Sequence, residues 1–217
     1  MRWIGALVAV ALLAALIWRL PINGWGSLCW FVYMAVMGAI RGPFEAASKT
    51  ESTSESRQTT LENALLFGVS LGAAFLPAAH LATGVLVFAD YAAPAWVPAI
   101  GIPLAALGLW LFWRSHTDLG RHWSVTLELR DEHQLVTNGV YRYMRHPMYS
   151  AIFLCYIAQA LFIQNWIAGF SGLVAFGTMY LVRARTEEAM MRAQFGDAYE
   201  RYCASTPRLL PRLSASS

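Results

Sequence analysis

Two short segments of this chain hold most of the residues that could carry out chemistry. Residues 133–149 read HQLVTNGVYRYMRHPMY, and residues 183–188 read RARTEE. Both are polar in a mostly apolar chain, and charge beside a membrane is costly unless it is solvated, paired or used. The side chains suited to chemistry are those of His133, Tyr141, Arg145, His146, Tyr149, Arg183, Glu187 and Glu188. We therefore expect the two segments to form one reaction centre.

The residues around Pro147 predict a helix that begins inside the first segment. Proline is tolerated in the first helical turn, and it favours an extended conformation for the preceding His146. A helix amino terminus favours a carboxylate or a phosphate, so an anionic group could bind beside His146. Arg183 and Glu187 are four residues apart and share one face of a later helix. An antiparallel hairpin between the two segments would bring that face back to His146.

Each of these residues also has a simpler interpretation. A single histidine at a membrane boundary is usually an interfacial residue, and Arg142 with Arg145 could be ordinary positive anchors. The nearby tyrosines could belong to the aromatic belt that lines membrane interfaces. Arg183 and Glu187 could form an exposed helical ion pair of small energetic consequence. The order of the motifs along the chain, rather than any one residue, favours a functional site.

Composition indicates an integral membrane protein rather than a soluble domain. Hydrophobic residues make up 57% of the chain and charged residues 13%, whereas soluble domains carry about a quarter charged residues. The net charge of +3 is modest, and the basic residues lie beside apolar segments, which favours a membrane surface over nucleic acid. Cys29, Cys155 and Cys203 share no metal-ligand spacing, so we expect neither a metal site nor a disulfide framework.

The apolar segments predict an all-α integral membrane protein with about six, or five to six, transmembrane helices. The predicted spans are residues 3–20, 25–40, 62–89, 95–113, 148–164 and 166–182. The last two are joined so tightly that they should form a helical hairpin. The first span lacks a small-residue cleavage site near its end, so we expect it to be a retained membrane helix rather than a signal peptide.

Two regions follow from this arrangement. Residues 1–113 would hold four membrane spans, and residues 114–217 would hold a cofactor loop, the hairpin 148–182 and a polar carboxy-terminal helix. The polar segment 45–60 has no periodicity, which predicts a mobile loop. It leads into Thr59-x-x-Glu62, a spacing typical of a capping box at a helix start.

The distribution of basic residues predicts the topology. With six crossings and a cytoplasmic amino terminus, every Lys and Arg residue except Arg19 lies on the cytoplasmic side. Both termini would then be cytoplasmic, and both polar segments would face the cytosol near the headgroups. The membrane would be a bacterial inner membrane or one like the endoplasmic reticulum.

The carboxy-terminal half resembles the isoprenylcysteine carboxyl methyltransferase family and its phospholipid-methyltransferase relatives. The resemblance covers about residues 115–211. The matching residues are His133-Gln134-Leu135-Val136, Gly139-Val140-Tyr141, Arg145-His146-Pro147-Met148-Tyr149, Arg183, Glu187-Glu188, Phe195-Gly196 and Tyr199. The first four spans carry no comparable motif. Thr126 stands where the eukaryotic enzymes tend to carry an amide, which is a departure from the family pattern.

This resemblance implies S-adenosylmethionine bound in a cytosol-facing pocket, with a lipophilic acceptor entering from the bilayer. Arg183 would orient the acceptor, and Glu187, Glu188 or His146 would serve as the base if the acceptor is an amine. The residues that would line the cofactor site are His133, Gln134, Leu135, Val136, Tyr141, Arg145, His146, Pro147, Met148, Tyr149 and Glu187. The resemblance implies no metal.

The resemblance leaves the acceptor and two other classes of protein open. The acceptor could be the carboxylate of an isoprenylated cysteine, a phospholipid headgroup, a quinone-like isoprenoid or a small thiol. An NADPH-dependent sterol or steroid reductase shares a similar carboxy-terminal half, but usually has an aromatic pair where this chain has Gly139-Val140-Tyr141. A non-catalytic membrane protein could also retain the fold.

Overall fold

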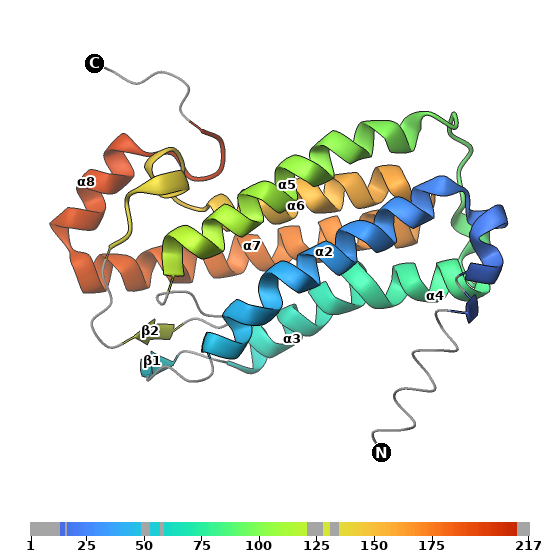
Figure 1. Ribbon diagram of the computed structural model, residues 1–217. Coiled ribbons are helices and arrows are strands. Elements are labelled where there is room, and N and C mark those ends of the chain that lie inside the picture. Colours follow the sequence, from blue (N-terminus) through green and yellow to red (C-terminus); the bar gives the residue numbers. More distant parts are fainter. Residues whose placement is uncertain are drawn as a thin grey trace.

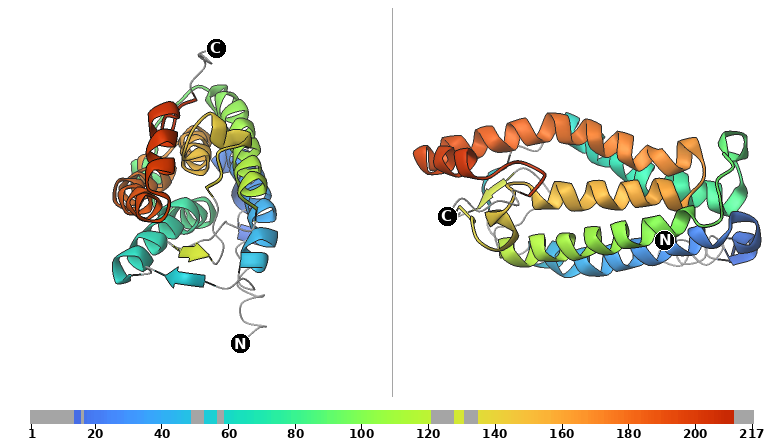
Figure 2. Two further views of the ribbon diagram at one scale, coloured as in Figure 1. Left: turned by 90° about the vertical axis from the view of Figure 1, so that its left-hand side faces the viewer. Right: turned by 90° about the horizontal axis from the view of Figure 1, so that it is seen from above.

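A computed structural model describes residues 14–15, 17–48, 53–56, 59–120, 128–130 and 135–211, and its main feature is a bundle of long helices (Figure 1). The helices are α2 (Trp25–Ser48), α3 (Thr60–Ser70), α4 (Leu76–Thr83), α5 (Val97–Leu119), α6 (Pro147–Phe162), α7 (Trp166–Phe195) and α8 (Asp197–Ser205). A π-helical turn, η1 (Leu71–Phe75), joins α3 to α4, and two 3₁₀ turns are η2 (Val87–Ala89) and η4 (Gly139–Arg142). Viewed from above, α6 lies between α5 and α7 (Figure 2, right).

The described helices confirm the all-α membrane class. Four are long and apolar enough to cross a membrane: Trp25–Ala47, Thr60–Thr83, Val97–Leu119 and Trp166–Phe195. The apolar helix α6 has 16 residues, which is shorter than a full span. The first predicted span, residues 3–20, lies mostly outside the described residues, so the number six stays a prediction. The chain is a multi-pass membrane protein.

The segment 45–60 contains more regular structure than its composition predicts. Helix α2 continues to Ser48, and strand β1 (Thr53–Ser56) pairs in antiparallel fashion with β2 (Glu128–Arg130). The expectation of a structureless loop was therefore wrong for part of this segment. Strand pairing uses backbone groups, and the partner strand lies far along the chain, so local composition carries no sign of it.

The predicted span 62–89 is shorter in the structure. Helix α4 ends at Thr83 because Gly84 adopts a left-handed conformation with φ 74° and caps the helix end. The residues that follow form the 3₁₀ turn η2 instead of more helix. The turn η1 brings Gly72 so close to the backbone of Ser171 that a side chain there would collide with it. Gly72 thus permits close packing of this helix against α7.

The predicted hairpin is present as α6 and α7. The Asn165 side chain caps α7 by accepting hydrogen bonds from the backbone N–H groups of Ile167 (3.0 Å) and Ala168 (2.8 Å). Its amide donates to the carbonyl of Leu86 and to Asp90, both at 2.7 Å, which ties the hairpin turn to the preceding loop. Helix α7 continues unbroken from the apolar arm through residues 183–188 to Phe195. The second polar segment is therefore rigidly connected to the bundle.

A buried glutamine connects the helices about one turn before the end of α6. Gln159 is fully buried, and its Oε1 accepts hydrogen bonds from Trp30 (3.3 Å) and Tyr33 (2.9 Å) of α2. Its Nε2 donates to the carbonyls of Gly72 (3.1 Å) and Ala168 (3.0 Å). Such hydrogen bonds between membrane helices fix how the helices are aligned. Gln159 thereby aligns α2, η1, α6 and α7.

Candidate active site

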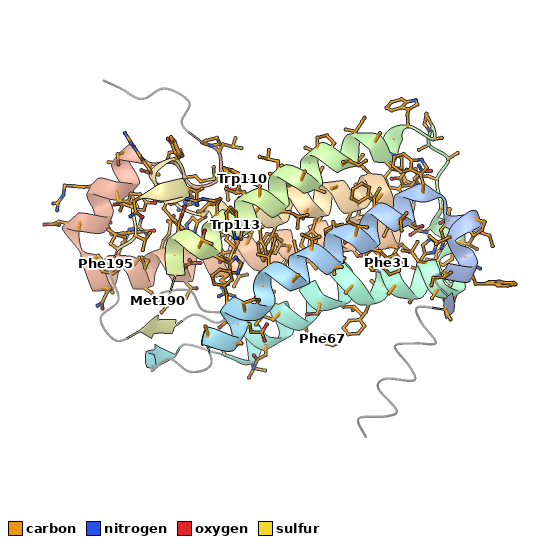
Figure 3. All side chains as sticks on the ribbon, in the orientation of Figure 1. Phe31, Phe67, Trp110, Trp113, Met190 and Phe195 are labelled. Carbon is orange, nitrogen blue, oxygen red and sulfur yellow. The ribbon has the colours of Figure 1, made fainter. Side chains whose placement is uncertain are left out.

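The two polar segments meet at one end of the bundle. Turn η4 and the start of α6 lie against the distal part of α7 and against α8 (Figure 1). Figure 3 marks this part of α7 by Met190 and Phe195, with polar side chains gathered beside it. The loop between α4 and α5 and the turn between α6 and α7 lie at the opposite end. All of the site residues described below are at the first end or one to two turns from it.

Turn η4 is held in place by Asp118 at the end of α5. Asp118 accepts a hydrogen bond from the backbone N–H of Val140 (2.9 Å), and Arg114 donates to its other oxygen at 2.7 Å. Gly139 has φ +57°, and a Cβ atom at this position would collide with the Asp118 carboxylate. The glycine of the Gly-x-Tyr motif is therefore required both by its conformation and by this close contact.

Tyr141 is buried beneath the site. Its hydroxyl donates to the backbone carbonyl of Ser115 (3.2 Å), and its own carbonyl accepts from the Tyr202 hydroxyl of α8 (2.6 Å). Burial raises the pKa of Tyr141 well above its ordinary value, so the phenol stays neutral. Tyr141 thus links η4 to α5 and α8.

The buried carboxylate of Glu188 is surrounded by basic side chains. Its side chain is 1% exposed, and Oε1 accepts hydrogen bonds from Arg145 (3.0 Å) and from Nε2 of His146 (3.2 Å). Arg208 donates to both carboxylate oxygens, from Nε at 2.9 Å and from its terminal nitrogen at 2.6 Å. Arg192 lies 3.7 Å from Oε2. A buried carboxylate with this many donors is well suited to holding its neighbours in one geometry.

Glu187 has a different environment although it is the adjacent residue. Its Oε2 accepts a hydrogen bond from the Tyr149 hydroxyl (2.7 Å), and its Oε1 lies 4.0 Å from Nδ1 of His146. The Glu187 side chain is 38% exposed. The His146 ring therefore lies between the two carboxylates, and Glu187 is the carboxylate that a ligand can reach.

Arg183 lies one helical turn from Glu187, toward the apolar part of α7, and contacts Glu62 of α3. The distance from an Arg183 terminal nitrogen to Glu62 Oε1 is 3.4 Å, and the two side chains are 13% and 6% exposed. Thr59 caps α3 as predicted, because its hydroxyl accepts from the Glu62 N–H at 3.1 Å. The spacing did not predict that the Glu62 carboxylate would face α7.

The other predicted cofactor residues lie along the same stretch of chain. Leu135 and Val136 are partly buried just before η4, Pro147 is buried in the first turn of α6, and Met148 is partly buried. His133 and Gln134 lie outside the described residues. Among the residues that the structure describes, no group of three or more His, Cys, Asp or Glu side chains could hold a metal ion.

Three residues of this end were not selected from the sequence: Glu62, Asp118 and Arg208. None lies in one of the two polar segments, and each reaches the site from another element. Arg208 follows Pro207 in the segment after α8. The sequence around Arg208 did not predict its contact with Glu188.

The part of the chain that carries the site is also a part that matches known proteins. The family model for phospholipid methyltransferases matches residues 96–198, which include η4, the start of α6 and both glutamates. A protein-S-isoprenylcysteine O-methyltransferase of Schizosaccharomyces pombe is 32% identical over 80 residues, covering 37% of this chain and 34% of the relative. Another, from Arabidopsis thaliana, is 29% identical over 118 residues, covering 54% and 60%. The resemblance to the isoprenylcysteine carboxyl methyltransferases is confirmed.

The fold agrees with that of an isoprenylcysteine carboxyl methyltransferase. A solved structure of the eukaryotic intramembrane Ras methyltransferase of this type superposes with a TM-score of 0.55 at 22% identity, covering 94% of this chain and 73% of that one. The chain spans between about one third and three fifths of the length of the two curated isoprenylcysteine methyltransferases. A relative of another name, the cobalt-zinc-cadmium resistance protein CzcN of Cupriavidus metallidurans, is 30% identical over 120 residues and covers 55% of this chain and 53% of its own length.

Proposed function

We propose that this protein transfers a methyl group from S-adenosylmethionine to a lipophilic acceptor that reaches the site from the membrane. The acceptor we infer is the carboxylate of an isoprenylated cysteine, on which the relatives in S. pombe and A. thaliana act according to their names. The observation that carries the proposal is the meeting of Arg145 and His146 with Glu187 and Glu188 at one end of a membrane bundle. These are the residues through which the chain resembles the methyltransferases.

The side chains present are compatible with S-adenosylmethionine. This cofactor carries a carboxylate, an ammonium group, ribose hydroxyls, a sulfonium and an adenine ring. The exposed part of Glu187 can accept hydrogen bonds from hydroxyls or from the ammonium group. The amino terminus of α6, beside His146, favours the carboxylate. The Tyr149 ring offers an aromatic face to the cation. His146, Tyr149 and Glu187 are therefore the residues of the described part that we assign to the cofactor, together with Leu135, Val136, Arg145, Pro147 and Met148.

Arg183 is placed to hold the acceptor. It lies four residues before Glu187 on α7, toward the apolar part of the helix, so its distance from the cofactor residues is about one helical turn. A guanidinium group can bind a carboxylate through two parallel hydrogen bonds. An acceptor with a prenyl chain would leave that chain among the apolar helices while its carboxylate met Arg183.

Methyl transfer of this kind needs alignment and a water-poor site more than it needs a strong base. When bound, S-adenosylmethionine supplies an electrophilic methyl group on a sulfonium. Arg183 would orient the attacking carboxylate, which is already nucleophilic, and Glu187 with Tyr149 would hold the donor. Glu188 keeps Arg145 and His146 in position. If the acceptor is an amine, Glu187 or His146 takes up the proton that it must lose. Glu188 is unsuited to this role because it is buried and both of its oxygens are bound by Arg145, His146 and Arg208.

We further propose that both termini lie in the cytoplasm, so that the site faces the cytosol. The support is the distribution of basic residues along the chain. Arg145, Arg183, Arg192 and Arg208 all gather at the end of the bundle that carries the site. The membrane would be a bacterial inner membrane or one like the endoplasmic reticulum.

The direct test combines cofactor binding with product identification. Calorimetry on the purified protein should show binding of S-adenosylmethionine, whereas tight binding of NADPH without S-adenosylmethionine would overturn the proposal in favour of a reductase. Membranes that contain the protein should then be incubated with methyl-labelled S-adenosylmethionine. We expect label in an isoprenylcysteine analogue. Label in phospholipid, isoprenoid quinone or small thiol would retain the methyltransferase and replace the acceptor.

A further inference from the structure

The chain after α8 lies across the start of α6. The carbonyl groups of Pro207 and Arg208 accept hydrogen bonds from the backbone N–H groups of Arg145 (2.8 Å) and His146 (2.9 Å). The Leu209 carbonyl accepts from the Ser150 hydroxyl (2.6 Å). Residues 206–211, which we call the carboxy-terminal strap, are thus bound to the backbone of the Arg-His-Pro motif. In Figure 1 the dark red strap runs from α8 back beside η4 and the beginning of α6.

Two arginines, Arg145 before α6 and Arg208 in the strap, add side-chain hydrogen bonds to this attachment. The Arg145 guanidinium donates to the carbonyl of Cys203 (3.1 Å) and to the carbonyl of Thr206, in addition to Glu188. From the strap, the Arg208 side chain reaches Glu188 and donates one hydrogen bond to each of its carboxylate oxygens, a two-pronged contact. The hydrogen bond to Glu188 raises the pKa of Arg208 above its ordinary value, so its positive charge is retained. One terminal nitrogen of Arg145 therefore binds carbonyl groups at the end of α8 and in the strap, and the other binds Glu188.

The contact of Arg208 determines how Glu188 can be oriented. Arg145 and His146 both bind Oε1 of this carboxylate, whereas Arg208 also reaches Oε2 at 2.6 Å. A carboxylate that is fixed through both oxygens cannot rotate about its last bond without losing a charged hydrogen bond. The orientation of Glu188 in turn fixes the His146 ring, whose other nitrogen faces Glu187.

We propose that Arg208 is a positioning residue of the cofactor site, acting through Glu188 on Arg145 and His146. Arg208 lies beyond residue 198, where the match to the family model ends. Its side chain is about half exposed, and it contacts Glu188 rather than the residues that we assign to the cofactor. This inference rests on the proposed function, because the quantity that Arg208 controls is the affinity for S-adenosylmethionine. A lysine would keep the charge at this position but could not form the two parallel hydrogen bonds.

The experiment measures the Kd for S-adenosylmethionine and the thermal midpoint of the full-length protein in detergent. We compare wild type with Arg208→Ala and Arg208→Lys, and use Arg201→Ala as the control, because Arg201 is an exposed arginine on the neighbouring helix α8. Arg208→Ala should raise the Kd by about tenfold or more, the scale on which groups that orient a binding residue act. Arg208→Lys should give a smaller rise, and Arg201→Ala should leave the Kd unchanged.

The possible outcomes separate the two proposals. Wild-type protein that binds no S-adenosylmethionine overturns the proposed function and this inference with it. Wild-type binding with an unchanged Kd in Arg208→Ala overturns the inference alone, even if the thermal midpoint falls, because that result would show a structural role only. If Arg208→Ala does not fold, Arg208→Lys decides: a wild-type Kd in that variant contradicts positioning by the two-pronged contact.

Discussion

At the scale of single residues, the adjacent Glu187 and Glu188 illustrate how neighbours in sequence can have separate roles. Glu188 points into the cluster of Arg145, His146 and Arg208, and is almost fully buried. Glu187 is more than a third exposed and shares a hydrogen bond with Tyr149. We therefore expect Glu188 to stabilise this end of the bundle and to position Arg145 and His146, and Glu187 to contact the cofactor directly.

Replacement of each glutamate by glutamine tests this division. Glu188→Gln leaves the buried Arg145 guanidinium without its counter-charge, and breaking a buried ion pair costs about 3–5 kcal/mol. Chemical denaturation should show that loss in the free energy of unfolding. Glu187→Gln serves as the matched variant, with little change in stability but weaker binding of S-adenosylmethionine by calorimetry. Equal losses of stability in the two variants would contradict the division.

Arg183 allows a second test at the residue scale. Arg183→Ala should lower turnover by about a hundredfold or more, as removal of a single positioned charged donor does in other enzymes, while the Kd for S-adenosylmethionine stays near that of wild type. The reason is that Arg183, one helical turn from Glu187 toward the apolar part of α7, is the residue that we propose to hold the acceptor. Arg185→Ala, an exposed neighbour on the same helix, is the control. Unchanged turnover in Arg183→Ala would remove this residue from the role of holding the acceptor.

At the scale of elements, the short turn η4 is positioned by a helix that contains no part of either polar segment. Asp118, at the end of α5, binds the Val140 N–H and leaves space only for a glycine at position 139. Tyr141 then reaches Ser115 on α5 as well. Turn η4 thus takes its position from its contacts with α5.

Gly139→Ala should show the importance of this contact. The alanine must adopt a left-handed conformation, which costs about 1–2 kcal/mol, and its Cβ atom also displaces the Asp118 carboxylate. We expect a lower thermal midpoint together with weaker S-adenosylmethionine binding. Gly42→Ala in α2 is the control, because open space surrounds that position and alanine favours helix. A Gly139→Ala protein with wild-type stability would contradict the contact.

At the scale of the whole molecule, the site lies at one end of the helical bundle, and other contacts hold the helices together further along it. Gln159 aligns α2, η1, α6 and α7 near the turn between α6 and α7. Glu62 then meets Arg183 nearer the end that carries the site. Four of the described helices are long and apolar enough to cross a membrane, so we expect that end to lie at the membrane surface. Entry of a lipophilic acceptor from the bilayer is consistent with this arrangement.

The membrane topology can be tested on the whole molecule with fused reporters. A reporter fused to the carboxy terminus should be found in the cytoplasm, because almost all arginines then lie on the cytoplasmic side. The same reporter placed after Gly24, near Arg19, should be found on the opposite side. Detection of the carboxy-terminal reporter outside the cytoplasm would overturn the six-span arrangement.

The sequence by itself determined the membrane class, the hairpin and the pairing of the two polar segments. Apolar length, the proline at the start of α6 and helical spacing are local features, so they can be read from consecutive residues. Local composition also misled in two places, since residues 53–56 form a strand within a segment predicted to be a loop, and the helix predicted over 62–89 ends at Thr83.

Only the tertiary structure decided which residues complete the site. Glu62, Asp118 and Arg208 each come from an element outside the polar segments, and they contact Arg183, Val140 and Glu188. Such contacts depend on how helices far apart in the chain pack and in which direction each side chain points. The different environments of Glu187 and Glu188 have the same origin, because adjacent residues on a helix point about 100° apart.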